Sequence, residues 1–193
     1  MGKFFSPVEV ATGLINTAKV FNCKYLRITE GEPTLDMDHL IHIMDNLKLS
    51  ESPHTFILET NGLILGRDVE SVKKLSQYAN LGSKKEPKMH VRVSIKGATP
   101  QKFRLLTFAD ARFHRFQFDA IRNCLNEGIS VHTAVMLDFI DSMEEIQYLK
   151  SSLASIDRNL LYTLEFERLF LEDYIVARLK KHSIPFKKIL KEA

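Results

Sequence analysis

The amino-acid sequence predicts an α/β fold: a partial (β/α) barrel in which a parallel sheet of about five strands carries helices on the outside. Short runs of strand-forming residues alternate along the chain with amphipathic helical patterns. These runs recur at intervals of about thirty to forty residues, the length of a strand–helix–strand unit. Strands joined in this way are parallel, and their crossovers are right-handed.

The size and composition of the chain fit one domain. It has 193 residues, 45% of them hydrophobic, and no linker divides it, so we expect a single (β/α) domain over residues 1–193. Because the net charge is only +3, we expect no specific nucleic-acid partner. No apolar run is as long as a membrane span and no signal-peptide pattern is present, so we expect no membrane partner and a cytoplasmic location.

The first half of the chain alternates capped helices with short strands. Ser6, Asp36 and Asp68 can each accept hydrogen bonds from the first turn of a helix. The apolar residues that follow at helical spacing predict helices over residues 6–21, 36–47 and 68–78. Branched and aromatic runs predict strands over residues 25–28 and 54–60, and a strand with its exit turn over 90–97.

The second half continues the alternation after an irregular segment over residues 98–111. A helix buried through Phe113, Phe116 and Cys124 follows, and Gly128 ends it. Further strands are predicted over residues 129–137 and 160–169, and further helices over 144–153 and 173–182.

Several side chains have an ordinary and a functional interpretation. The phenylalanines between Phe103 and Phe118 predict core packing rather than a ligand cage. His39 and His42 could form a metal-binding face of a helix, but exposed polar side chains explain them better. His114 is predicted to face solvent, and His132 fits the pocket or the core equally well.

Three strands end in polar clusters that contain glycine: Glu30-Gly31-Glu32-Pro33, Glu59-Thr60-Asn61-Gly62 and Ser94-Ile95-Lys96-Gly97. The carboxyl ends of parallel strands lie on one rim, where ligands of α/β proteins bind. A carboxylate, an amide and an ammonium group there could hold a zwitterion. Glu32 would take its amino group, and Lys96 or Ser94 its carboxylate.

This order of strand ends resembles the radical S-adenosylmethionine superfamily, in particular proteins similar to the glycyl-radical-activating enzymes. The resemblance runs from about Phe4 to Met136. It implies that Gly31, Glu32 and Pro33 hold the amino end of S-adenosylmethionine. Glu30 replaces the first glycine of the family's Gly-Gly-Glu-Pro turn and adds a charged side chain beside this site.

The same resemblance assigns roles to the later strand ends. Thr60 and Asn61 would line the pocket, and Ser94 and Lys96 would meet the carboxylate or ribose of S-adenosylmethionine. The segment from Val131 to Val135 would lie under the adenine. The substrate that supplies the hydrogen atom is not identified by these residues.

The family's Cys-x-x-x-Cys-x-x-Cys loop, which binds a [4Fe-4S] cluster, does not occur in this sequence. Cys23 and Cys124 lie far apart in apolar contexts, which predicts reduced core thiols and no metal site. The resemblance therefore predicts a fragment without the first strand and its cysteine loop. A full-length form with that loop would bind the cluster and cleave S-adenosylmethionine reductively to a 5′-deoxyadenosyl radical. The chain as given would be inactive.

Two alternatives remain open. The chain could be a non-catalytic nucleotide-binding or interaction module derived from the same fold. It could also be an unrelated (β/α) enzyme that uses Glu32, Glu59 and Lys96 in acid–base roles.

The missing first strand predicts an uncovered apolar edge at Tyr25–Ile28, which proteins normally avoid. We therefore expect the isolated chain to dimerise, to aggregate or to need a partner chain that covers this edge. Light scattering on the purified chain measures this directly, and a stable, monodisperse monomer would contradict the expectation.

Overall fold

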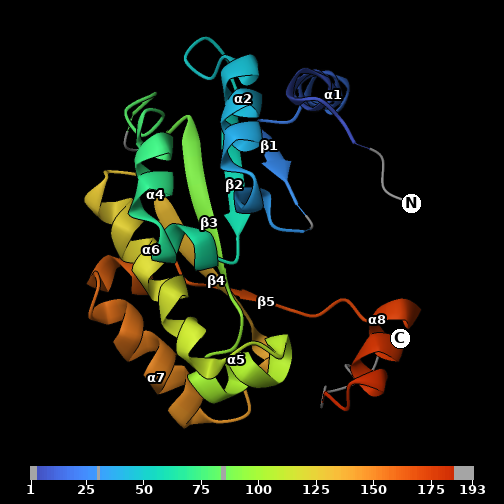
Figure 1. Ribbon diagram of the computed structural model, residues 1–193, viewed down its shortest axis with the longest axis vertical. Coiled ribbons are helices and arrows are strands. Elements are labelled where there is room, and N and C mark those ends of the chain that lie inside the picture. Colours follow the sequence, from blue (N-terminus) through green and yellow to red (C-terminus); the bar gives the residue numbers. More distant parts are fainter. Residues whose placement is uncertain (1–3, 30, 84–85, 185–193) are drawn as a thin grey trace. The chain divides into compact units, whose positions relative to one another are not determined.

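Five strands form one sheet in chain order in the computed structural model, which describes residues 4–29, 31–83 and 86–184 (Figure 1). The strands are β1 (Tyr25–Ile28), β2 (Thr55–Thr60), β3 (Met89–Ile95), β4 (Val131–Met136) and β5 (Glu165–Glu167). β1 with β2, β2 with β3, and β4 with β5 pair in parallel. The predicted α/β class and the parallel five-stranded sheet are confirmed.

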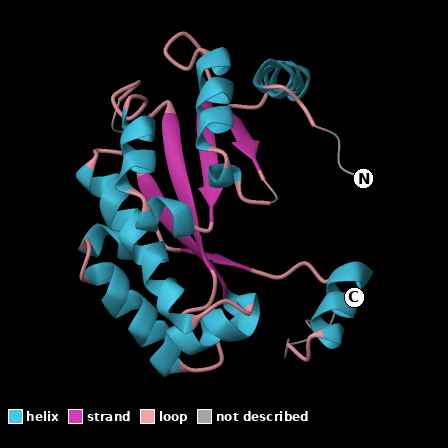
Figure 2. Ribbon diagram, in the orientation of Figure 1, coloured by secondary structure: helices cyan, strands magenta, loops and turns pink. Residues whose placement is uncertain are grey.

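Helices alternate with these strands along the chain (Figure 2). They are α1 (Pro7–Phe21), α2 (Met37–Leu47), α3 (Leu63–Arg67), α4 (Val69–Ser76), α5 (Pro100–Thr107), α6 (His114–Asn126), α7 (Met143–Ala154) and α8 (Asp173–Lys181). The chain divides into two compact units. The first comprises residues 1–94 and 116–132, and the second comprises residues 95–115 and 133–193.

Local side-chain caps begin the helices of the first unit. Ser6 and Glu9 form a reciprocal capping box, in which the Ser6 amide donates to the Glu9 carboxylate at 2.7 Å. Asp36 accepts a hydrogen bond from the His39 amide at 3.0 Å, and Asp68 caps α4 in the same way. These are the three caps that the sequence predicts.

Alternation along the strands determines which side chains form the core of the first unit. Phe56 and Leu58 of β2 are fully buried, whereas Ile57 and Glu59 lie on the opposite face and are only half-buried. Helices α2, α4 and α6 lie on one face of β1, β2 and β3 (Figure 1).

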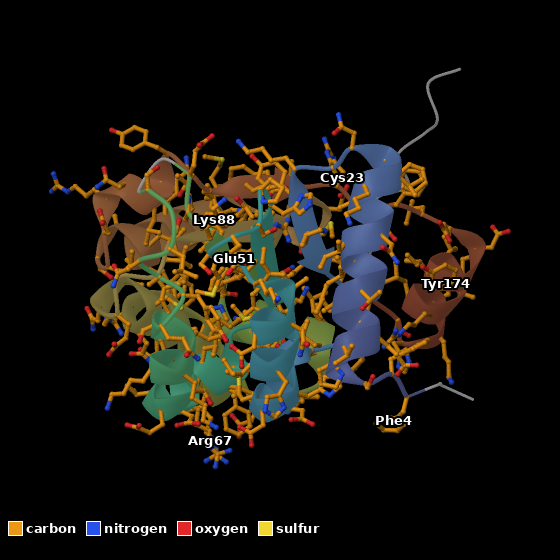
Figure 3. The ribbon with its side chains drawn as sticks, turned by 90° about the horizontal axis from the view of Figure 1, so that it is seen from above. Phe4, Cys23, Glu51, Arg67, Lys88 and Tyr174 are labelled. Atoms are coloured by element: carbon orange, nitrogen blue, oxygen red, sulfur yellow. The ribbon has the colours of Figure 1, made fainter. Side chains whose placement is uncertain are left out.

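The edge of the sheet at β1 is bordered by apolar surface. Among the described residues, β1 has a strand neighbour only in β2. Side chains of α1 and β1, including Val10, Leu14 and Leu26, line a hollow of about 510 Å³ beside it. Phe4 and Cys23 mark the two ends of α1 in Figure 3. Cys23 is exposed, so the prediction of a core thiol is wrong there, although it is confirmed for the buried Cys124. Cys23 directly follows Asn22, the left-handed C-cap of α1.

The buried stripe of α6 includes Cys124, as the sequence predicts, but it differs from the prediction at the start of the helix. Phe113 is 38% exposed, whereas His114 is 2% exposed, so the prediction of a solvent-facing His114 is wrong. Asp110 caps a short 3₁₀ turn that contains Phe113, and the α-helix begins only at His114. The inward stripe then runs through His114, Phe118, Ile121 and Cys124, which are spaced three or four residues apart.

The second unit contains a helix where the sequence predicts an irregular segment. Thr99 caps α5 by accepting a hydrogen bond from the Lys102 amide at 3.2 Å, and Pro100 occupies the first turn. The buried Lys102 ammonium forms ion pairs with Asp141 and Glu145. Burial lowers the pKa of Lys102, but these two carboxylates outweigh burial and raise it overall. The last strand, β5, is shorter than the predicted segment 160–169 because residues 158–161 form a 3₁₀ turn.

A close helix contact in the first unit requires a glycine. A Cβ atom at Gly66 of α3 would lie 1.8 Å from the Phe116 carbonyl oxygen of α6. The sequence does not predict α3, whose five residues are too few for a periodic pattern.

The Gly66→Ala substitution is therefore expected to lower the free energy of unfolding by about 1–3 kcal/mol, because two backbones must separate to admit the methyl group. Urea denaturation measures this loss. The matched control is Gly13→Ala in α1, where no atom lies within 4 Å of the new Cβ. That change is expected to stabilise the protein by up to about 1 kcal/mol, the difference in helix propensity. Equal effects of the two substitutions would contradict the close contact.

Candidate functional site

The candidate site lies in the first unit, where β1 and β2 end. Gly31 has a φ angle of +64°, a left-handed conformation that turns the chain after β1 and favours glycine. Apart from its two chain neighbours, no atom of the described residues lies within 4 Å of the position that a Gly31 Cβ would take, and Gly31 is exposed, so a ligand can approach its backbone. Pro33 follows in the first turn of a 3₁₀ helix that Glu32 caps.

The Glu32 carboxylate ties the two strand ends together. Its Oε1 accepts hydrogen bonds from the amide and the hydroxyl of Thr34, at 3.2 and 2.7 Å, and from the Thr60 hydroxyl at 2.7 Å. Its Oε2 accepts one from the Asn61 amide at 2.7 Å. A carboxylate has about four acceptor positions, so these donors use most of its capacity. Glu32 therefore shapes the rim, and its side chain has little capacity left for the amino group of a ligand.

The loop after β2 is held by further local bonds. The Thr60 hydroxyl accepts from the Gly62 amide at 3.0 Å, and the Asn61 side-chain oxygen accepts from the Leu63 amide at 2.9 Å. The second of these bonds satisfies an amide at the start of α3. The loop from Thr60 to Leu63 is thus fixed by its own side chains and by Glu32.

The structure brings together five of the predicted site residues: Gly31, Glu32, Pro33, Thr60 and Asn61. Ser94 and Val131 belong to the same unit and are buried on β3 and β4. Lys96 is exposed directly after β3, and Val135 is buried in β4, but both belong to the second unit.

Three charged side chains form a network on the sheet face opposite Phe56 and Leu58. Glu59 lies between two arginines, with Oε2 at 3.0 Å from Arg27 Nε and Oε1 at 2.8 Å from Arg92 Nη1. The Arg92 side chain is only 3% exposed, and a buried guanidinium group needs such a partner. The sequence analysis missed both arginines. The sequence feature that could have identified them is a charged residue within an apolar strand, on the same face of the sheet as Glu59.

The described residues do not fit an iron–sulfur cluster. No group of three or more His, Cys, Asp or Glu side chains in this part of the chain could hold a metal ion. Cys124 is fully buried, and burial raises the pKa of its thiol to about 12. Cys23 alone is exposed.

No family model matches the sequence, and no curated protein matches it significantly. Within the described ranges, no helix is both long enough and apolar enough to cross a membrane.

The hydrogen bonds of Glu32 lead to a prediction about the free energy of unfolding. The Glu32→Gln substitution replaces one acceptor oxygen by an NH₂ group that faces fixed backbone donors. We expect it to lower the free energy of unfolding by about 1–3 kcal/mol and to speed hydrogen exchange of the Asn61 amide. The control is Glu51→Gln at an exposed position, with an expected change within about 0.5 kcal/mol. If the two variants are equally stable, Glu32 does not hold the rim together.

Proposed function

We propose that this chain is part of a radical S-adenosylmethionine enzyme, in which it forms an arc of a (β/α) barrel and binds S-adenosylmethionine at the carboxyl ends of its strands. The observation that carries the proposal is the joined pair of loops after β1 and β2, fixed by the Glu32 carboxylate. This is the strand end at which parallel α/β sheets bind ligands.

The order of the strands supports the barrel. A doubly wound sheet reverses direction along its strand order, whereas a (β/α) barrel adds each new strand on the same side of the last. The sheet runs from β1 to β5 without a reversal. Five strands in this order are a consistent arc of such a barrel.

The rim offers backbone groups rather than free carboxylates. Because the oxygens of Glu32 accept hydrogen bonds from Thr34, Thr60 and Asn61, we assign the amino group of the ligand to the exposed backbone around Gly31. The Glu32 carbonyl accepts a bond from the Leu35 amide at 3.2 Å and keeps a second lone pair. In this proposal the side chain of Glu32 positions the carbonyls, and the carbonyls contact the ligand.

The iron–sulfur cluster of the proposed enzyme would supply the electron that cleaves the sulfonium group. The residues of this chain do not fit that cluster, since its two cysteines cannot supply the three thiolates of the family's loop. We therefore propose that the 193-residue chain binds S-adenosylmethionine without cleaving it, and that cleavage needs a form of the protein with the cysteine loop.

The second candidate function is a non-catalytic nucleotide-binding module. This function is favoured for the chain by itself because the chain has only the two cysteines Cys23 and Cys124. An acid–base enzyme that uses Glu32 and Glu59 is less well supported, because one carboxylate is filled by hydrogen bonds and the other is paired with Arg27 and Arg92.

Isothermal titration of the purified chain with S-adenosylmethionine tests the proposal. We expect saturable binding that Gly31→Val weakens at least about tenfold, a loss of about 1.4 kcal/mol, because the side chain strains the turn and covers the open backbone. Gly128→Val is the matched control: Gly128 is also exposed and left-handed, with no atom within 4 Å of its Cβ position.

Competition with ATP distinguishes a radical S-adenosylmethionine site from a general nucleotide-binding module. A radical S-adenosylmethionine site discriminates against ATP, whereas a general nucleotide module binds ATP comparably. Absence of S-adenosylmethionine binding at millimolar concentration, or equal weakening by the two glycine variants, would overturn the proposed site.

A further inference from the structure

A second cluster of reactive side chains lies at the opposite end of the sheet from Glu32. His90 is the second residue of β3, His132 is the second residue of β4, and Ser130 directly precedes β4. All three belong to the first unit. The Ser130 hydroxyl lies 2.7 Å from His90 Nδ1, and the other ring nitrogen of His90, Nε2, is hydrogen-bonded to His132 Nδ1.

Strand register explains why these residues meet. The Val91 amide donates to the Ser130 carbonyl at 2.8 Å, which aligns the start of β3 with the residue before β4. Because side chains alternate along a strand, His90 and His132 project from the same face. Their rings stack with centroids 4.8 Å apart and planes inclined by 19°.

The serine and its neighbouring histidine line a hollow of about 430 Å³. Its other lining residues are Lys24, Tyr25, Thr55, Ile57, Glu86 and Pro87. Ser130 and His90 are half-buried, so each is shielded by protein on one side and reachable through the hollow on the other. Lys24 and Glu86 form an exposed ion pair of 2.9 Å, which leaves this part of the wall with no net charge.

The protonation state of His90 suits it to accept a proton from Ser130. Burial, and then the charge of His132, lower the pKa of His90 to about 4, so the ring is neutral at pH 7. Two arrangements of hydrogens satisfy these two contacts, and the proposal below takes the one in which Ser130 O–H donates to His90 Nδ1 and His90 Nε2–H donates to His132 Nδ1. The lone pair of His90 is then directed at the serine hydroxyl.

We propose that Ser130 is a nucleophile for acyl transfer, with His90 as its general base, and that the hollow binds a small uncharged ester. His132 is a positioning residue that holds the tautomer and the plane of the His90 ring. In the step, Ser130 Oγ forms a bond to the ester carbonyl carbon, and its proton moves to His90 Nδ1. The bond to the leaving alcohol then breaks, and the alcohol leaves with that proton. Water hydrolyses the acyl-serine by the same route.

Because its pKa is low, His90 is a weak base, and this determines which measurement of Ser130 reactivity is the most sensitive. A base with a pKa far below the working pH takes the proton at an energetic cost, so turnover is expected to be slow. Formation of one stable covalent adduct is therefore a more sensitive measurement than steady-state hydrolysis.

The test uses an uncharged alkyl fluorophosphonate probe on the whole purified chain, with intact mass and peptide mapping as readouts. Ser130 Oγ replaces fluoride on phosphorus, and the proton passes to His90. We expect one adduct, located on Ser130. It should disappear in Ser130→Ala, and its rate of formation should fall by at least about 100-fold in His90→Gln. Ser50→Ala, at an exposed serine, is the control and should label as the natural chain does.

The pH dependence of labelling tests the positioning role of His132. The charged or titratable groups that contact His90 or line the hollow with it are His132, Lys24, Glu86 and Tyr25, and the buried Arg92 lies two residues further along β3 on the same face. Because the charge of His132 lowers the pKa of His90, His132→Asn is expected to raise that pKa. The acid side of the rate profile should therefore move to higher pH, whereas a displacement of Ser130 that leaves the surroundings of His90 unchanged would lower the rate at every pH alike.

Circular dichroism melting checks that each variant is folded. Absence of an adduct on Ser130 in the folded natural chain would overturn the proposal, and so would undiminished labelling in folded His90→Gln. Labelling of the unmodified chain tests the proposal even where a variant fails to fold. The outcome is independent of S-adenosylmethionine binding, because Gly31 and Glu32 lie at the other end of the strands.

Discussion

The carboxylate of Glu32 is the interaction on which the candidate ligand site depends. It accepts hydrogen bonds from Thr34, Thr60 and Asn61, residues of two different loops, and so converts two strand ends into one surface. Backbone loops at the end of a sheet are otherwise held only by their own turns. A charged acceptor bonded to backbone and hydroxyl donors is among the stronger polar contacts in proteins. This side chain joins the turn after β1 to the end of β2, while Thr60 and Asn61 hold the beginning of α3.

Polar side chains at the two ends of the sheet in the first unit are satisfied in different ways. At the carboxyl ends of the strands, the oxygens of Glu32 are satisfied by hydroxyl and amide donors. At the amino ends, His90 is neutral, because an unpaired charge would be costly in its half-buried position beside His132. Oxygens that are satisfied by fixed donors suit the holding of a ligand-binding loop, whereas a neutral imidazole beside a hydroxyl suits proton transfer. The S-adenosylmethionine site and the Ser130 nucleophile are therefore distinct proposals about distinct parts of one unit.

Sequence patterns were most successful where the determining contacts are local. Ser6, Asp36 and Asp68 cap helices within three residues, so the residue type alone indicates their role. The apolar pattern gave a wrong prediction where a shift of one residue in the start of a helix changes which side chains face the core. A single 3₁₀ turn before α6 places His114 in the core and leaves Phe113 partly exposed. An apolar stripe predicts that a helix is amphipathic, but its phase depends on where the helix begins.

The sequence by itself determined the alternation of strands and helices, the parallel sheet, and the shared location of Gly31, Glu32, Thr60 and Asn61. Parallel strands must end at a common edge, and this follows from connection length alone. Only the tertiary structure decided that the oxygens of Glu32 are occupied, that Gly66 meets the backbone of α6, and that His90 pairs with His132 across 42 residues of sequence. These contacts depend on strand register and on the distance between packed backbones. No local pattern of residues encodes either quantity.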